Sequence, residues 1–231
     1  GGTWMRTIGT VVRGVRAPIL QAGDDLAAVV LQAVKNAEAE CGSPLRDRDV
    51  VAVTESVLAR TQGNYASLAQ IAADVRAKIP AGPDGRRVCG IVFPILSRNR
   101  FSMLLRGISM GVDKLYVLLS YPSDEVGNAL IPLEMLEEKG VDPYRDVLTE
   151  EEYRRLFGQR VPHPFTGIDY VELYKSVAGN AEIILANDPR AMLAYAEHVI
   201  ACDIHTRKRT CRLLKEAGAK TVLSLSDLLN A

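Results

Sequence analysis

Four short polar segments directly follow apolar runs that are expected to form strands. They are Glu55 and Ser56 after 49–54, Arg98 and Arg100 after 88–96, Asp124 and Glu125 after 114–120, and Asp188 after 181–186. Ligands of open parallel sheets bind at the carboxyl ends of the strands, where such segments meet. We therefore expect the four segments to share one edge of a sheet. We further expect Arg98, Arg100, Asp124 and Asp188 to line one cleft there.

The arginines and the acids of these segments favour different ligands. Arg98 and Arg100 stand at the expected start of a helix, where guanidinium and backbone N–H groups bind phosphate or carboxylate. The alternative is a helix cap with solvated arginines. Asp124 and Glu125 offer the carboxylate oxygens that Mg²⁺ prefers, and the alternative is an acidic turn. Neither segment has the glycine spacing of a P-loop or a dinucleotide fingerprint.

Two histidines are candidates for proton transfer. His163 lies in the segment His-Pro-Phe-Thr-Gly and is a candidate general acid–base group, with a structural role as the alternative. One interpretation is an enzyme that uses Asp124, His163 and His205 as its catalytic residues.

A zinc site is a further possibility. His198, Cys202 and His205 have i, i+4 and i+7 spacing, which places them on one side of a continuous helix. With water or Cys211 as the fourth ligand, they could bind zinc. The alternative is a buried cysteine beside partly exposed histidines.

A basic cluster follows these residues and consists of Arg207, Lys208, Arg209, Arg212 and Lys215. It is typical of a solvated helix face, and an anionic ligand is the second interpretation. The chain has 28 Lys and Arg against 28 Asp and Glu, so its net charge is zero. Because no aromatic side chains interleave the cluster, we expect no specific nucleic-acid binding.

The order of the expected elements indicates an α/β fold, with a mixed α+β fold as the alternative. Strands are expected at 7–13, 49–54, 88–96, 114–120, 181–186 and 221–225. Helices are expected at 24–40, 67–78, 100–110, 169–177 and 190–217, with two short helices between 122 and 164. Ser67 with Gln70, and Thr149 with Glu152, have capping-box spacing. We expect βαβ units, a mostly parallel sheet and helices on both faces, in two regions, 1–84 and 85–231.

Two general properties concern location. No apolar run is long enough to cross a membrane, and the amino terminus lacks the apolar core of a signal peptide. The four cysteines are widely scattered, which is typical of reduced thiols. These properties favour a cytoplasmic protein without a membrane partner.

Residues 9–63 resemble the amino-terminal part of the coenzyme F420-0:L-glutamate ligase family, the F420 γ-glutamyl ligases. The resemblance rests on Arg16-Ala-Pro-Ile-Leu-Gln-Ala-Gly-Asp-Asp-Leu26 and on the segment from Leu45 to Gly63. Four later segments resemble a longer bacterial branch of the family. They are Leu96–Phe101, Leu119–Asn128, His163–Gly167 and Cys202–Thr206.

The resemblance implies a GTP-dependent (or ATP-dependent) amide ligase that adds glutamate through a γ-linkage. It implies Mg²⁺ or Mn²⁺ as cofactor and an intertwined homodimer as the working form. The nucleotide contacts that it implies are Ala17, Pro18, Ile19, Leu20, Glu55, Ser56 and Arg60. Arg60 replaces a lysine of the family and keeps a cation for phosphate. Glu55 places a carboxylate where the family has a small or amide group.

The family's metal-binding carboxylates belong to two later motifs, Asn-Ala-Gly-x-Asp and Thr-Asp-Thr-x-Gly-Arg, and neither occurs in this sequence. This indicates an amino-terminal portion or a shortened homologue. The leading hypothesis is therefore a ligase-like protein that binds a nucleotide or an acidic small molecule, and catalysis by this chain alone is not expected. The alternative is a non-catalytic binding or assembly module that recognises an anionic small molecule or a protein partner.

Overall fold

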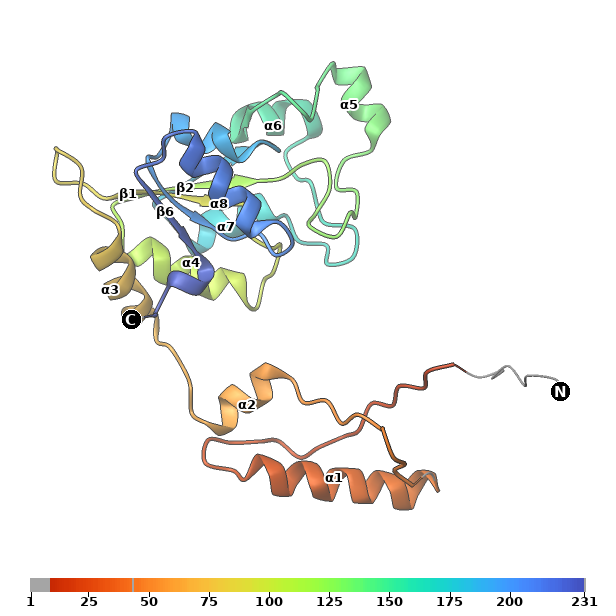
Figure 1. The fold of residues 1–231 in the computed structure, drawn as a ribbon. Coiled ribbons are helices and arrows are strands. Elements are labelled where there is room, and N and C mark those ends of the chain that lie inside the picture. Colours follow the sequence, from red (N-terminus) through yellow and green to blue (C-terminus); the bar gives the residue numbers. More distant parts are fainter. Residues whose placement is uncertain (1–8, 43, 231) are drawn as a thin grey trace. The chain divides into compact units, whose positions relative to one another are not determined.

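The computed structural model describes residues 9–42 and 44–230, and the chain divides into two compact units (Figure 1). The first unit is Gly1–Ala66 and the second is Ser67–Ala231. The sequence pattern had placed the boundary at residue 84. The division lies earlier because α3 (Leu68–Lys78) packs against α4 (Phe101–Met110) and so belongs to the second unit.

The described part of the first unit contains two helices, α1 (Leu26–Cys41) and α2 (Glu55–Thr61). The helix α1 begins where the Asp25 side chain accepts a hydrogen bond of 3.0 Å from the backbone N–H of Ala28. It ends at Gly42, whose φ of 59° lies in the left-handed region that favours glycine. The helix expected at 24–40 is thus confirmed.

Two expected strands are absent from the described part of this unit. Residues 49–54 form no strand, and neither do residues 9–13, while Thr7 and Ile8 lie outside the described residues. A β-branched run forms a strand only where another strand supplies its hydrogen bonds. Here Val50, Val51 and Val53 are exposed, and α2 begins directly after Thr54.

The second unit is built on a sheet of six strands in the order β3-β4-β2-β1-β5-β6. Its strands are β1 (Val88–Val92), β2 (Lys114–Leu119), β3 (Leu148–Thr149), β4 (Ala181–Leu185), β5 (His198–Ala201) and β6 (Thr221–Ser224). All neighbouring strands are parallel except β3 and β4. The expected α/β fold with a mostly parallel sheet is confirmed.

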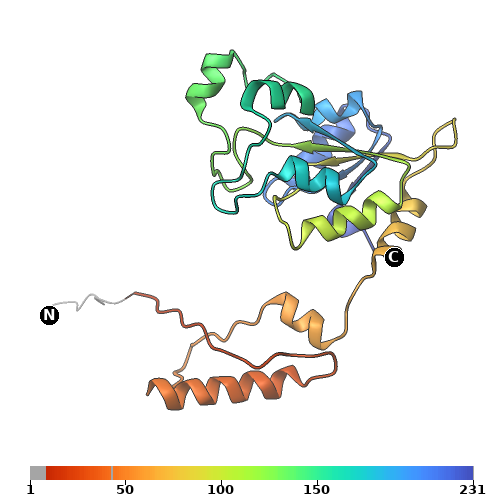
Figure 2. The ribbon, with the colours of Figure 1, turned by 180° about the vertical axis from the view of Figure 1, so that it is seen from behind.

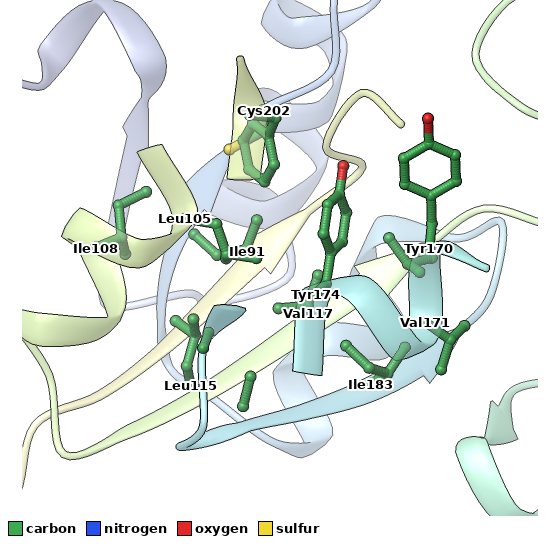
Figure 3. Close-up of a cluster of buried hydrophobic side chains, with 14 of the residues drawn as sticks. Ile91, Leu105, Ile108, Leu115, Val117, Tyr170, Val171, Tyr174, Ile183 and Cys202 are labelled. Carbon is green, nitrogen blue, oxygen red and sulfur yellow. The ribbon is translucent and has the colours of Figure 1, made fainter. Parts of the chain in front are cut away.

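Helices cover both faces of this sheet. The helices α4 and α7 (Tyr170–Val177) lie in front of the sheet in Figure 2, and α8 (Arg207–Glu216) lies in front of it in Figure 1, viewed from the other side. Figure 3 shows Leu105 of α4 next to Ile91 of β1, in the buried cluster that also contains Tyr174 of α7. Shorter elements complete the unit: α5 (Leu133–Lys139), α6 (Glu150–Phe157), and the 3-10 helices η1 (Pro189–Ala194) and η2 (Leu225–Asp227).

The central strand β1 separates the two core clusters by alternation. Cys89 and Ile91 belong to the larger cluster under α4 and α7, while Val92 belongs to the cluster that contains Met192. Gly90 faces Met192 so closely that a Cβ atom at residue 90 would lie 2.5 Å from its sulfur. A side chain at position 90 would displace the core of that face.

Residues 190–217 do not form the expected long helix. They contain the end of η1, the strand β5 and the helix α8. Val199 pairs with Gly90 of β1 and with Val222 of β6, so this segment completes the sheet between two parallel strands. The apolar run Val199–Ala201 is buried on both faces, which is typical of a central parallel strand and hard to distinguish from a buried helix by periodicity.

The contact between α3 and α4 predicts that Gly107→Ala lowers the free energy of unfolding by about 1–3 kcal/mol. A Cβ atom at position 107 would lie 2.8 Å from Cβ of Ile71, which is a branched atom that cannot move aside. Helix propensity alone would favour alanine by about 0.5–1 kcal/mol, so a net loss identifies the clash. Urea unfolding measures the change. Gly179→Ala is the control because nothing lies within 4 Å of its Cβ position, and a stabilised Gly107→Ala variant would contradict this packing.

Candidate functional site

The carboxyl ends of β1, β2, β4, β5 and β6 lie at one edge of the sheet, because these strands are parallel. The segments that contain Arg98, Arg100, Asp124 and Asp188 follow β1, β2 and β4, so their placement at one edge is confirmed. That they line one cleft stays a prediction. Glu55 and Ser56 differ, because they begin α2 in the first unit and follow no strand.

The order of the strands reverses between β1 and β5. The chain runs from β1 to β2 and β4 on one side, and then crosses to β5 and β6 on the other. Such a switch point is where open α/β sheets bind ligands. The loops after β1 and β5 flank it, and these loops contain Arg98 and Arg100 on one side and Asp203–Thr206 on the other.

The loop after β1 is held by a buried tyrosine of α7. The Tyr174 hydroxyl donates a hydrogen bond of 2.5 Å to the carbonyl of Ile95 and accepts one of 3.1 Å from the N–H of Ser97. The Ser97 hydroxyl in turn accepts a hydrogen bond of 3.2 Å from the N–H of Arg100. Burial is the main cause that raises the pKa of Tyr174, so its hydroxyl keeps its proton and remains a donor.

This loop presents Arg98 and Arg100 to solvent at the start of α4. Both side chains are exposed, and the only hydrogen bond from either guanidinium to a described residue runs from Nε of Arg98 to Asn99, at 3.3 Å. The first turn of α4 contains no acidic residue and no side-chain cap. Two cations at the positive end of a helix dipole favour an anionic ligand.

Asp124 and His163 come together although they lie far apart in the sequence. Nε2 of His163 lies 3.1 Å from Oδ2 of Asp124, and both side chains are almost fully buried. Nδ1 of His163 accepts hydrogen bonds from the backbone N–H groups of Phe165 and Thr166, at 3.2 and 3.3 Å. The ring proton is therefore assigned to Nε2, which donates to Asp124. Both ring nitrogens are engaged, so the pair joins two loops of the sheet edge.

Asp124 is surrounded by donors. Its Oδ1 accepts from the N–H groups of Val126 and Asn128, and its Oδ2 accepts from the Asn128 side chain as well as from His163. Burial alone raises the pKa of Asp124, but these hydrogen bonds outweigh it and hold the pKa below its ordinary value. The carboxylate is ionised and already fully hydrogen-bonded.

A divalent cation at Asp124 and Glu125 would need carboxylate oxygens that are free to bind it. Four donors occupy Asp124, and Oε2 of Glu125 accepts from the N–H of Leu96 at 3.3 Å. A cation would have to replace these donors. Within residues 9–42 and 44–230, no group of three or more His, Cys, Asp or Glu side chains could hold a metal ion. The expected Mg²⁺ or Mn²⁺ site does not fit Asp124 and Glu125.

The expected zinc site, with His198, Cys202 and His205 on one side of a helix, is wrong. His198 lies in β5 and its Nδ1 is 2.8 Å from the Thr221 hydroxyl, so the three residues are not on one helix. Cys202 is buried directly after β5, and His205 is exposed in the loop before α8. Burial raises the pKa of the Cys202 thiol, which favours its protonated form over a thiolate ligand.

His205 and the basic cluster belong to the β5 side of the switch point. His205 lies in the loop after β5, whereas Asp124 follows β2, and β1 separates these two strands. A catalytic role for Asp124, His163 and His205 together stays a prediction. Within the basic cluster, Arg212 pairs with Glu216 at 3.5 Å, while Arg207 donates from Nε to the carbonyl of Asp203 at 2.9 Å.

The nucleotide contacts that the resemblance implies lie in the first unit. Ala17, Pro18 and Ile19 are exposed, and Leu20 is buried. A hydrogen bond of 2.8 Å from the N–H of Gly23 to the carbonyl of Thr61 joins the segment after Leu20 to the end of α2, which contains Arg60. Glu55 and Ser56 lie at the other end of α2 and are exposed.

Two residues of the site had no clear signal in the sequence. Tyr174 lies far along the chain from the loop that it holds. Asp203 follows β5, a strand that the expected long helix concealed. Recognising Val199–Ala201 as a strand would have placed Asp203 at a strand end.

The described helices include none that is long and apolar enough to span a membrane. A family model described as F420-0:Gamma-glutamyl ligase matches residues 14–201, which is most of the chain and includes parts of both units. No curated protein and no solved structure matches the sequence.

Proposed function

Because the chain belongs to the F420-0:gamma-glutamyl ligase family, we propose that it binds a nucleotide or another anionic small molecule at the carboxyl edge of its sheet. The observation that carries this proposal is the exposed pair Arg98 and Arg100, held at the start of α4 by Tyr174 and Ser97. A ligase joins a carboxylate to an amine, and a nucleotide can supply the phosphoryl group that activates the carboxylate. Family membership therefore supports GTP or ATP as the ligand.

Ligation of glutamate would require more than this binding. Phosphoryl transfer to a carboxylate gives an acyl phosphate, which the amine then attacks with loss of phosphate. The transfer brings negative charges together, and fixed cations and a metal ion normally offset their repulsion. Arg98 and Arg100 supply fixed cations, but Asp124 and Glu125 are engaged in hydrogen bonds. We therefore propose ligand binding without glutamate ligation by this chain alone.

A non-catalytic binding or assembly module is the second candidate. It is favoured by the Asp124–His163 pair, whose hydrogen bonds hold two loops that expose Val126 and Phe165. Apolar side chains that gather into one exposed patch mark surfaces that bind a protein partner. Under this alternative the loops recognise a protein partner, and GTP, ATP and glutamate are not ligands.

Calorimetric titration with GTP, ATP and glutamate, followed by a turnover assay, separates the two candidates. We expect a nucleotide to bind, and we expect turnover with Mg²⁺, glutamate and candidate acceptors to stay below roughly 1 s⁻¹. Faster turnover that is lost in Asp124→Asn would contradict the proposal, because it would place a metal-dependent centre at Asp124. Binding of none of the three ligands would favour the assembly module.

We also propose that the chain forms the homodimer that the family resemblance implies, through the first unit. An apolar groove of about 540 Å³ runs along α1 in this unit. The residues that line it are all apolar: Leu26, Ala27, Val30, Leu31, Val34, Leu45, Val51 and Val53. None of the residues of α1 is buried, so a second copy could cover this face.

The dimer proposal predicts that Leu31→Glu shifts the protein from dimer to monomer. A charge in the groove would have to be desolvated without a partner, which weakens association by at least about tenfold. Sedimentation velocity measures the change. Gln32→Glu adds the same charge one residue along α1, outside the groove, and should leave the dimer intact. A parent protein that is monomeric at all concentrations would contradict the proposal.

A further inference from the structure

Only one of the two carboxylate oxygens of Asp203 accepts a hydrogen bond from the described part of the protein. Asp203 follows β5 and is 8% exposed. Its Oδ2 accepts hydrogen bonds from the N–H and the hydroxyl of Thr206, at 3.1 and 2.8 Å. Its Oδ1 is buried, and no described residue donates to it. Buried polar atoms are normally hydrogen-bonded, so this oxygen is suited to a donor from a ligand.

The same carboxylate lies against the first turn of α8, because its partner Thr206 occupies the N-cap position of this helix. The first turn contains Arg207, Lys208 and Arg209 and no acidic residue, and the Thr206 side chain does not cap its N–H groups. Cations at this end of a helix oppose its dipole. An anion would be bound by both the cations and the free N–H groups.

The three cations are not equivalent. Arg207 donates from Nε to the Asp203 carbonyl, so it is held beside the carboxylate. Arg209 is close enough to Asp188 to help lower the pKa of that carboxyl, after the larger effect of Arg190. Lys208 is exposed and has no ion-pair partner among the described residues. Arg207 and Lys208 are thus the cations available to a ligand.

Asp203 and the first turn of α8 lie at the switch point of the sheet, between β1 and β5. The N–H of Cys202, the residue before Asp203, donates to the carbonyl of Val92 at the end of β1, at 2.8 Å. After this bond the segment that follows β1 continues to Arg98, and the segment that follows β5 continues to α8. In dinucleotide-binding sheets a carboxylate at a strand end binds the hydroxyls of a ribose whose phosphate lies at a helix N-terminus.

We propose that Asp203 and the first turn of α8 form a subsite for a phosphate ester with a neighbouring hydroxyl group. The hydroxyl donates to Oδ1 of Asp203, and the phosphate is bound by Arg207, Lys208 and the N–H groups of the first turn. The ribose phosphate of a nucleotide and a free sugar phosphate share this chemistry. The inference rests on the proposed function only if the source is a nucleotide.

Calorimetry of the full chain with two probes tests the subsite. Ribose 5-phosphate carries phosphate and hydroxyls, whereas methyl phosphate carries no hydroxyl on its carbon. We expect ribose 5-phosphate to bind at least about tenfold more tightly. In Asp203→Asn this ratio should fall to near one, because the amide is a poorer acceptor, while methyl phosphate should bind as well as before. Lys208→Ala should weaken both probes, and Arg212→Ala, which removes an arginine paired with Glu216, should weaken neither.

Several outcomes would overturn the subsite. They are equal affinity of the parent for both probes, no binding of ribose 5-phosphate at about 1 mM, and an unchanged ratio in Asp203→Asn. If Asp203→Asn fails to fold, the two probes with the parent and with the exposed Lys208→Ala decide the question. GTP distinguishes the sources: dependence of GTP binding on Asp203 identifies a nucleotide. Ribose 5-phosphate binding without GTP binding identifies a free sugar phosphate and refutes the nucleotide proposal alone.

Discussion

Asp169→Asn is expected to lower the free energy of unfolding by about 3–5 kcal/mol, the usual cost of breaking a buried ion pair. Arg154 of α6 binds both carboxylate oxygens of Asp169, at 2.5 and 3.0 Å. The side chain of Asp169 is 1% exposed and that of Arg154 is 12% exposed. Asparagine keeps the shape of the side chain but removes the charge that faces both guanidinium nitrogens, and it leaves Arg154 only the longer ion pair with Glu150, at 3.9 Å. Denaturant unfolding measures the loss.

The same carboxylate makes stability depend on pH. Burial alone raises the pKa of Asp169, but hydrogen bonds from Arg154 and from the N–H groups of Glu172 and Val161 outweigh it and lower the pKa. A depressed pKa in the folded state stabilises the protein above the ordinary pKa of about 3.9, and this stability is lost as pH falls toward the folded value. The stability of Asp169→Asn should therefore fall less steeply below about pH 4 than that of the parent.

Glu197→Gln is the matched control for this substitution. Glu197 pairs with Lys220 at 2.6 Å, but both side chains are about 60% exposed. Exposed ion pairs contribute roughly 0–1 kcal/mol, so the control should change stability little. Equal effects of the two substitutions would contradict the role assigned to Asp169, which also accepts from the first turn of α7.

The double substitution Arg98→Ala/Arg100→Ala is expected to weaken GTP binding by about 100-fold. Hydrogen bonds to charged groups contribute about 1.5–3 kcal/mol each, and about 1.4 kcal/mol corresponds to tenfold in affinity. Both side chains are exposed and neither forms an ion pair within the described residues, so the fold should be unaffected. Calorimetry measures the affinity, and thermal unfolding checks the fold.

A charge-matched variant, Arg86→Ala/Lys220→Ala, removes two cations from the opposite edge. Arg86 precedes β1 and Lys220 precedes β6, so both lie at the amino ends of parallel strands. Nucleotide affinity should be unchanged in this variant. If both double variants weaken binding equally, the effect is due to net charge, and the assignment of the site to Arg98 and Arg100 is wrong.

The parts of the fold that depend on local sequence could be predicted. The capping boxes of Ser67 with Gln70 and of Thr149 with Glu152 are present, because their hydrogen bonds form within one turn. Residues 49–54 are expected to form a strand but form none, and residues 198–201 are expected to be helical but form β5. Whether an apolar run pairs with other strands depends on distant residues, such as Gly90 and Val222 for β5. No local pattern contains that information.

In the candidate site, too, contacts between distant residues could not be predicted from the sequence. The sequence indicated Asp124 and His163 separately, and the structure joins them by a hydrogen bond. It could not indicate that Asp124 accepts four hydrogen bonds, because these depend on the shape of the loop and on a histidine 39 residues away. The hydroxyl of Tyr174 and the free oxygen of Asp203 are likewise defined only by packing.

We propose that Arg98 and Arg100, and not a metal bound by Asp124 and Glu125, bind the anionic ligand. Titration of the full chain with GTP in Mg²⁺ and again in EDTA tests it most directly. We expect GTP to bind in EDTA at least as tightly as in Mg²⁺, because free GTP keeps its full charge for the arginines. We also expect Asp124→Asn to change the affinity less than Arg98→Ala/Arg100→Ala does. GTP binding that requires Mg²⁺ and is lost in Asp124→Asn would show instead that a metal ion at Asp124 binds the ligand.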